Sequence, residues 1–244
     1  MIDWLRDEMR EPSVTVAGRT LPIVLRRHAR ATRLTMRLSP DGGEVRITLP
    51  RWGRTRDALV FAEARSEWIA AQLARVPAPL AIGPGASVPY RGQALTIDWS
   101  ERHPRKPVLN GDTLRLGGTA DSLPQRVRRW LEGEALRLFA QDLASYCVRD
   151  GRAAPDIRLS RAQRRWGSCT GERDTGRVIR INWRLVMAPD HVRRSVVAHE
   201  VAHLTHFDHS PAFHAALARL YEGDIGVADD WLKREGRRLY AAFG

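Results

Sequence analysis

Three histidines and one glutamate in the C-terminal part of the chain have the types and the spacing of a hydrolytic metal site. Residues 198–203 contain the pattern H-E-x-x-H, with His199 and His203 four residues apart. On a helix this spacing places both imidazoles on one face, where they can bind one ion, and Glu200 can take a proton from a water bound to that ion. Catalytic zinc sites have three protein ligands and one open position. We therefore predict one Zn²⁺ per chain, held by His199, His203 and a third residue, with Glu200 as catalytic base.

The third ligand must lie beyond this helix, and the sequence favours His209. Ser210-Pro211 directly after it form a helix start, with serine as the cap and proline in the first turn. The chain therefore turns at His209, which lets its imidazole reach back to the metal. Glu222, on a later predicted helix, is the alternative third ligand, and Cys169 is an alternative fourth ligand or inhibitory thiolate.

The spacing from His199 to His209 equals that of the metzincins, H-E-x-x-H-x-x-G-x-x-H. Two features argue against a metzincin proper: His206 replaces the glycine of that pattern, and no methionine follows Met187. A purely structural zinc is disfavoured because such sites fill all four positions and would give the glutamate no role. His206 and His214 are interpreted as neighbours of the site that do not bind the metal.

The elements that must position these residues form an α+β pattern. The H-E-x-x-H helix begins after Pro189, and a long helix ending near Asp150-Gly151 precedes it. The first half of the chain is β-rich, and residues 34–38 and 45–49 predict a hairpin because apolar residues alternate on both sides of a glycine turn. Further strands are predicted at residues 14–16, 21–25, 95–99, 113–116, 157–159, 165–169 and 178–181.

These elements divide the chain into two predicted regions. Residues 1–118 form a β-rich N-terminal region with one helix at 55–76, and residues 119–244 form a helical core that carries the metal site. Residues 77–85 are rich in proline and glycine and are predicted to be a loop. We find no internal repeat and no low-complexity segment.

Composition and charge exclude several classes of protein. The chain has 244 residues, of which 43% are hydrophobic and 28% charged, as in globular proteins. No apolar run reaches the roughly 18 residues of a membrane span, the N-terminus lacks a secretory signal, and Cys147 and Cys169 are too few for a disulfide scaffold. We predict a cytoplasmic protein with no membrane partner. Dispersed arginines carry nearly all of the net charge of +12, which predicts a solvated surface with weak attraction for nucleic acid.

Five segments share their order and intervals with a known protein family. They are Arg165-Trp166-Gly167-Ser168-Cys169, Ile181–Leu185, Ala188-Pro189, His199–Leu204 and His209–Phe213, with weaker likeness at residues 26–50 and 67–69. Together they resemble the YgjP-like metallopeptidase family, which is related to SprT-like and Wss-type zinc peptidases. Val201 and His214 depart from the family's common leucine and tryptophan, but neither is a predicted ligand.

The resemblance implies a zincin-type core in which a small sheet packs on the H-E-x-x-H helix. It also implies that His199, His203 and His209 bind zinc, that Glu200 is the base, and that residues 166–169 lie beside the active site.

The segment from Arg165 to Cys169 is a candidate substrate-binding strand. A glycine within a strand permits close approach of another backbone, so this segment is predicted to align an extended peptide by backbone hydrogen bonds. The alternative is that Trp166 and Cys169 are core residues and Gly167 marks a bulge. Tyr221, His206 and Arg165 are candidates for stabilising the oxyanion.

We predict a zinc-dependent hydrolase, most simply a metallopeptidase that acts on a protein or peptide. The competing hypothesis is a nucleic-acid-associated protein that uses its basic sheet as a platform, by analogy with SprT-like relatives that act on DNA-bound proteins, with hydrolysis secondary or lost. The sequence does not indicate the oligomeric state or the bond that is cleaved.

Overall fold

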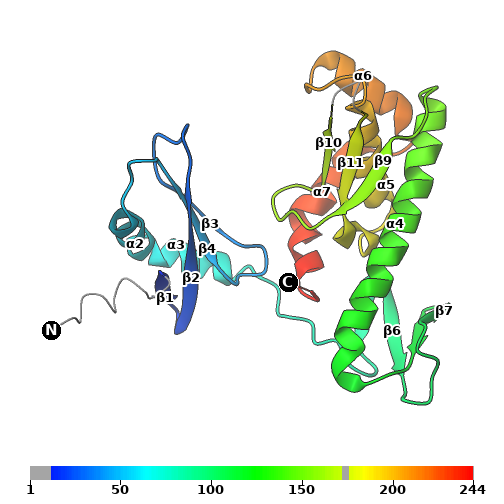
Figure 1. Cartoon of the computed structure of the whole chain (residues 1–244), viewed down its shortest axis with the longest axis horizontal. Helices are drawn as coiled ribbons and strands as arrows, with labels where there is room; N and C mark the ends of the chain where they lie inside the picture. The colour runs from blue at the N-terminus through cyan, green and yellow to red at the C-terminus, as the bar shows by residue number, and fades with distance from the viewer. Residues whose placement is uncertain (1–11, 172–175, 244) are drawn as a thin grey trace. The chain divides into compact units, whose positions relative to one another are not determined.

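The computed structural model describes residues 12–171 and 176–243, and the chain divides into two compact units between Ala78 and Pro79 (Figure 1). Each unit combines strands with helices, so the α+β class predicted from the sequence is confirmed. Within the described residues, no helix has the length and apolar character needed to cross a membrane.

The first unit is a four-stranded sheet with two short helices on it. The strand order is β1-β2-β4-β3, in which two antiparallel hairpins are joined by the parallel pair β2 and β4. The hairpin predicted at residues 34–49 is β3 and β4. The elements are β1 (Ser13–Val16), β2 (Arg19–Arg27), β3 (Thr35–Leu38), β4 (Val45–Leu49), α2 (Thr55–Glu63) and α3 (Ser66–Leu73).

The single helix predicted at residues 55–76 is two helices. Arg65 leaves helical geometry, with φ of −114° and ψ of 19°, and α3 ends at Leu73. The break turns Ala58 and Ala62 of α2 and Ile69 of α3 toward one core, in which all three are fully buried.

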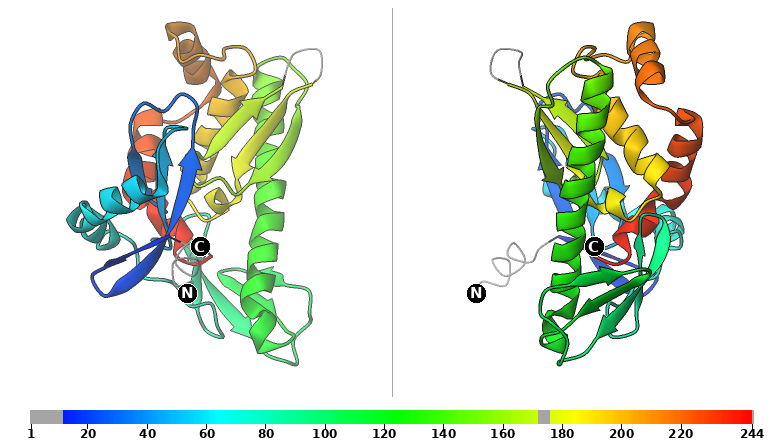
Figure 2. Two further views of the ribbon diagram at one scale, coloured as in Figure 1. Left: turned by 60° about the vertical axis from the view of Figure 1, so that its left-hand side comes forward. Right: turned by 90° about the vertical axis from the view of Figure 1, so that its right-hand side faces the viewer.

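The second unit contains two sheets and the long helix α4. Figures 1 and 2 show α4 running from the sheet that contains β6 and β7 to the sheet that contains β9 and β11. The strand orders are β5-β6-β8-β7 and β10-β11-β9. The elements are β5 (Ser87–Tyr90), β6 (Gln93–Trp99), β7 (Val108–Asn110), β8 (Thr113–Leu116), η1 (Ala120–Ser122), α4 (Leu123–Arg149), β9 (Asp156–Ser160), β10 (Gly167–Thr170), β11 (Val178–Asn182), η2 (Trp183–Val186), α5 (Asp190–Ala202), α6 (Pro211–Leu220), α7 (Ile225–Glu235) and η3 (Gly236–Tyr240).

Strands β5 to β8 lie in the second unit, whereas the sequence predicted them in an N-terminal region that ends at residue 118. The reason is a shared core. Ile97 and Leu114 of this sheet belong to the same buried cluster as Leu131 of α4 and Val197 of α5. These contacts join residues far apart in the sequence, and the compact units therefore divide at 78/79.

The sheet β1–β4 and the sheet β5–β8 are one topology built twice, so the expectation of no internal repeat is wrong. Both sheets have an antiparallel hairpin, a central parallel pair and a second antiparallel pair in the same order. The first hairpin of each sheet turns at two residues with positive φ, as a type I′ turn requires. These are Ala17 and Gly18, with φ of 51° and 74°, and Arg91 and Gly92, with φ of 52° and 79°. The sequence repeats as well, because Ser13, Val14, Gly18, Leu21 and Ile23 recur as Ser87, Val88, Gly92, Leu95 and Ile97.

The second copy of this hairpin turn holds the start of α5. The backbone N–H groups of Arg91 and Gly92 donate to the carbonyls of Val186 and Met187, at 2.8 and 3.1 Å. The Arg91 guanidinium also donates to the Asp190 carboxylate in the first turn of α5 at 3.0 Å. The fold thereby fixes the beginning of the helix that carries the H-E-x-x-H pattern.

Candidate active site

Helix α5 is held in place by a buried ion pair on the side facing α4. Arg193 donates to the Asp142 carboxylate at 2.7 Å, and the two side chains are 3% and 7% exposed. Burying an isolated charge would cost several kcal/mol, so each group depends on the other. The helix also contacts β10 and β11. The H-E-x-x-H residues are therefore carried by a helix fixed to both α4 and the sheet.

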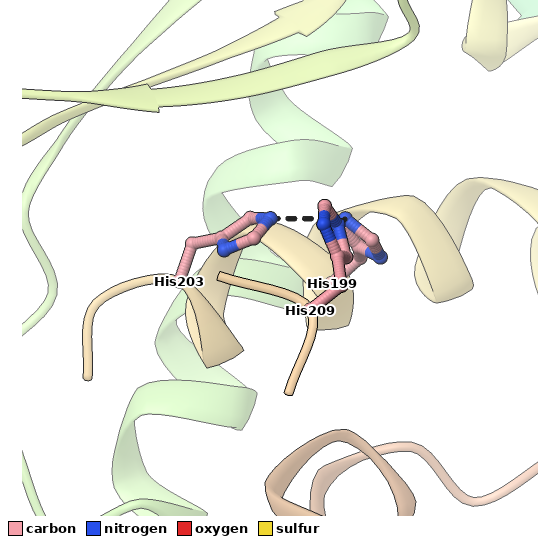
Figure 3. A group of neighbouring side chains, drawn as sticks. All are labelled: His199, His203 and His209. Atoms are coloured by element: carbon pink, nitrogen blue, oxygen red, sulfur yellow. Dashed lines mark hydrogen bonds between the residues drawn. The ribbon is translucent and has the colours of Figure 1, made fainter. Parts of the chain in front are cut away.

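The structure brings His199, His203 and His209 together at the end of α5 (Figure 3). The Nε2 atom of His199 lies 3.1 Å from Nε2 of His203 and 3.2 Å from Nε2 of His209. Zinc–nitrogen bonds of about 2.0–2.1 Å in a tetrahedron place ligand nitrogens about 3.3 Å apart. Both distances from His199 are close to the spacing that a tetrahedral zinc ion requires, and the ligand atoms of all three histidines lie within 4.8 Å of one another.

Local structure directs two of these imidazoles. His203 ends α5, and its Nδ1 lies 2.8 Å from the His206 carbonyl oxygen. A carbonyl only accepts, so Nδ1 carries the proton and Nε2 presents its lone pair to the site. His209 lies just before Ser210, whose hydroxyl accepts the Phe213 N–H and caps α6, so the chain turns where the sequence predicted.

Two further residues support the cluster and were not predicted to do so. The Phe213 ring is fully buried, and its centroid lies 4.9, 4.6 and 4.8 Å from those of His199, His203 and His209. Arg177 donates to the carbonyls of His203 and Leu204 and so neutralises the end of α5. Phe213 was named in the sequence only as the end of the segment His209–Phe213, without a role. Arg177 carried no local signal.

Burial favours the neutral form of two of the three imidazoles. It lowers the pKa of His199 to about 4, with help from the neighbouring His203 and His209. Burial also lowers the pKa of His203. A neutral imidazole is the form that binds a metal, so these two side chains are ready to act as ligands near neutral pH.

Glu200 is buried beside the histidine cluster, with 5% of its surface exposed. Burial raises its pKa to about 7, while the charge of Arg165 and the backbone N–H of Cys169, which donates to the carboxylate, act in the opposite direction. The Oε2 atom is inaccessible to solvent and has no hydrogen-bond partner. A buried carboxylate oxygen with no partner is uncommon in folded proteins, and functional sites are one explanation.

Gly167 makes room for this carboxylate. A Cβ atom at Gly167 would lie 2.7 Å from Cγ and 2.8 Å from Cδ of Glu200, and closer still to Oε1. The sequence predicted that another backbone approaches this glycine closely, whereas within the described residues the approaching group is the Glu200 side chain. Gly167 begins β10, whereas Arg165 and Trp166 precede the strand.

A cavity of about 240 Å³ opens beside Glu200 and His199. Arg165, Trp166 and Gly167 form one wall, and α5 and α7 form the others through Ser195, Val196, Ile225, Asp229 and Leu232. Trp166 is only half-buried, and its ring also stacks on Tyr240, with centroids 5.9 Å apart. The predicted substrate-binding segment therefore lies beside both His199 and Glu200.

The other candidates have different surroundings. Glu222 accepts from Tyr146 and Arg149 at 3.0 Å and pairs with Arg194 at 2.6 Å, so it belongs to an ionic network with α4 and α5. Tyr221 is buried and donates to the His191 carbonyl at 2.8 Å. Cys169 is outside the group of metal-ligating atoms found among the described residues. Burial and the Glu200 charge raise the pKa of its thiol.

Comparison with known proteins gives one family match. The model of the YgjP-like, metallopeptidase domain matches residues 34–235 of this chain. No curated protein and no solved structure matches. The matched range includes the whole of the histidine cluster, Glu200 and strand β10.

Proposed function

Because the chain belongs to the YgjP-like metallopeptidase family, we propose that it is a zinc-dependent peptidase in which His199, His203 and His209 hold one Zn²⁺ and Glu200 is the catalytic base. One observation carries the proposal. The ligand atoms of the three histidines converge within 4.8 Å of one another, and Glu200, which follows His199 on the same helix, has a buried carboxylate oxygen with no partner.

The donor set fits zinc. Three neutral imidazoles suit Zn²⁺ and leave a fourth position open, as catalytic sites require. Zinc bound there would polarise a substrate carbonyl and lower the pKa of a coordinated water. His203 Nδ1 keeps its proton and donates a hydrogen bond to the His206 carbonyl oxygen, which keeps the imidazole ring oriented.

Glu200 moves the proton. Its carboxylate takes a proton from the attacking water and later donates it to the nitrogen of the leaving amine. Gly167 and the Cys169 N–H hold the carboxylate in position from the β10 side, and α5 holds it from the other. Burial removes competing water from the carboxylate and favours transfer to a bound reactant.

Strand β10 is suited to align the peptide because it lies at the edge of its sheet. The Trp166 carbonyl accepts from the Asn182 N–H, so these two residues form a hydrogen-bonded pair of the antiparallel strands. Hydrogen-bonded pairs occur at every second residue, and the N–H and C=O groups of Gly167 and Cys169 therefore point away from β11. The Cys169 N–H already donates to Glu200. An extended substrate would therefore bond to the N–H and C=O of Gly167 and the C=O of Cys169.

The cavity beside Glu200 would take one substrate side chain. Trp166, Val196, Ile225 and Leu232 give it apolar walls, which favour an apolar residue next to the scissile bond. Arg165 lies at the same cavity and is the candidate for stabilising the oxyanion with the metal. Tyr221 is less suited to this role because its hydroxyl is bonded to the His191 carbonyl.

The test is cleavage of a mixture of synthetic peptides, with new termini identified by mass spectrometry. Wild-type protein with one equivalent of zinc should cleave peptides that have an apolar residue beside the broken bond. Glu200→Gln should keep its zinc and lose cleavage, and His203→Ala should lose both. Wild-type activity in Glu200→Gln would refute the assigned base. A zinc-loaded wild type that cleaves no peptide would refute the peptidase.

A further inference from the structure

The duplicated sheet carries a basic, aromatic pocket in each copy. In the first unit the pocket has a volume of about 360 Å³ and lies between the start of β3 and the helices α2 and α3. In the second unit it has about 850 Å³ and lies between the segment before β7 and the start of α4. Both volumes are in the range of ligand sites, about 300–1,000 Å³. The two pockets thus occupy the same place in the two copies.

The lining residues correspond as well. In each copy cationic residues come from the chain that leads into the third strand: Arg33 in the first, Arg105 and Lys106 in the second. The helix that follows the fourth strand contributes an aromatic side chain to each pocket, Phe61 of α2 in the first copy and Trp130 of α4 in the second. In each copy another pocket residue follows four positions later, Arg65 in the first and Glu134 in the second.

The helix also adds cations to each pocket. Arg65 lies over the Phe61 ring at 5.2 Å in the first copy, and Arg126 and Arg129 line the second. Arg126 donates to the Arg105 carbonyl and lies against Gly118, where a Cβ atom would collide with its guanidinium. This guanidinium is therefore held in place at the pocket wall.

These cations have few negative partners. Among the described residues, none of Arg33, Arg65, Arg105, Arg126 and Arg129 pairs with a carboxylate. The one carboxylate in the second pocket, Glu134, is already bonded to Arg137 at 2.6 Å and to the Tyr90 hydroxyl at 2.8 Å. Both pockets therefore have an excess of positive charge beside an aromatic surface.

We propose that the chain binds single-stranded nucleic acid through these two pockets. Phosphates would contact Arg33 and Arg65 in the first copy and Arg105 and Arg129 in the second, and bases would stack on the nearby aromatic rings. A polymer suits the arrangement because it repeats the same anionic and aromatic unit, as the protein repeats the pocket. Two pockets on one chain bind a long strand more tightly than either binds a short one. This proposal is independent of the peptidase.

The test uses fluorescence anisotropy of labelled thymidine oligonucleotides with the full-length protein. A 30-mer should bind at least tenfold more tightly than a 6-mer. Arg33→Ala/Arg65→Ala and Arg105→Ala/Arg129→Ala should each weaken the 30-mer about tenfold and reduce this difference. Each should also lower the slope of log K against log salt concentration by about 1.4, since a single-stranded phosphate contact contributes about 0.7.

A matched control distinguishes binding at the two pockets from nonspecific attraction to the net positive charge of the protein. Arg219→Ala/Arg234→Ala removes two exposed arginines of the second unit that line neither pocket, and should change the affinity less than twofold. Equal losses in the control and pocket variants would overturn the proposal, as would absence of binding by wild type. Thymidine monophosphate that competes as well as the 6-mer would identify a free nucleotide as the ligand instead.

Base stacking has its own test. Trp68 lines the first pocket and is 38% exposed, so it can be shortened at low structural cost. Trp68→Ala should weaken oligonucleotide binding about tenfold and leave binding of inorganic polyphosphate unchanged. Equal effects on oligonucleotide and polyphosphate binding, or no effect on either, would refute the proposal that bases stack on the aromatic rings.

Discussion

Replacing Gly167 by alanine should displace the catalytic base while the metal ligands stay in place. The added Cβ atom would lie 2.7 and 2.8 Å from Cγ and Cδ of Glu200, whereas ordinary contacts begin at 3.4 Å. Either the carboxylate or β10 must therefore retreat by at least about 0.7 Å, because Oε1 lies closer still than Cγ. Since a misplacement of about 1 Å can cost about 100-fold in rate, we expect Gly167→Ala to lower kcat between about 10- and 100-fold.

The assay for this variant combines peptide cleavage with zinc content. We expect zinc to remain near one equivalent, because the three atoms nearest to the added Cβ all belong to Glu200 and none belongs to a histidine. Ser168→Ala is the matched control in the same strand, and its cleavage rate should stay within about threefold of wild type, since it adds no atom toward Glu200. Unchanged kcat in Gly167→Ala, with the substitution verified, would refute the claim that this glycine makes room for the base. Loss of zinc together with activity would show that the strand supports the ligands rather than the base.

Three further predictions concern the scaffold. Gly133→Ala, at an exposed position of α4 with open space around it, should raise the free energy of unfolding by about 0.5–1 kcal/mol in urea denaturation, and a decrease would contradict the geometry. Asp142→Ala leaves the Arg193 guanidinium buried with only Asp190 as a partner and should cost about 3 kcal/mol, part of which Asp142→Leu/Arg193→Met should restore; a double variant no more stable than the single one would show that the charge is not the cause. Arg177→Ala removes the donor to the carbonyls at the end of α5 and should weaken zinc affinity about tenfold, measured by competition with a chelator, and unchanged affinity would exclude this supporting role.

The candidate site could be predicted from the sequence where its geometry is local. The spacing of His199 and His203 on one helix, and the Ser210-Pro211 start that turns the chain at His209, depend on neighbouring residues only. The contributions of Gly167 and Arg177 depend on β10 and β11 meeting α5, which no local pattern contains. The sequence therefore indicated the proposed ligands and the proposed base, but not the groups that surround them.

The repeat and the unit boundary were missed for physical reasons as well. Only five positions match between the two hairpins: three are buried strand residues, one is the turn glycine and one is an exposed serine, and the positions between them differ. The second copy buries its sheet against α4, the first against α2 and α3, and the core shared with α4 moves the boundary away from residue 118. The break of the helix at Arg65 likewise follows from a core that only the folded sheet provides.

The measurement that tests the central claim most directly is the metal content of the purified protein. Wild type and His203→Ala are prepared without added metal, then offered zinc, dialysed and analysed by elemental mass spectrometry. The account predicts about one zinc per chain in wild type and none retained by His203→Ala, with both variants folded by circular dichroism. A wild type that stays free of metal after zinc is supplied, or a His203→Ala variant that retains a full equivalent, would contradict it.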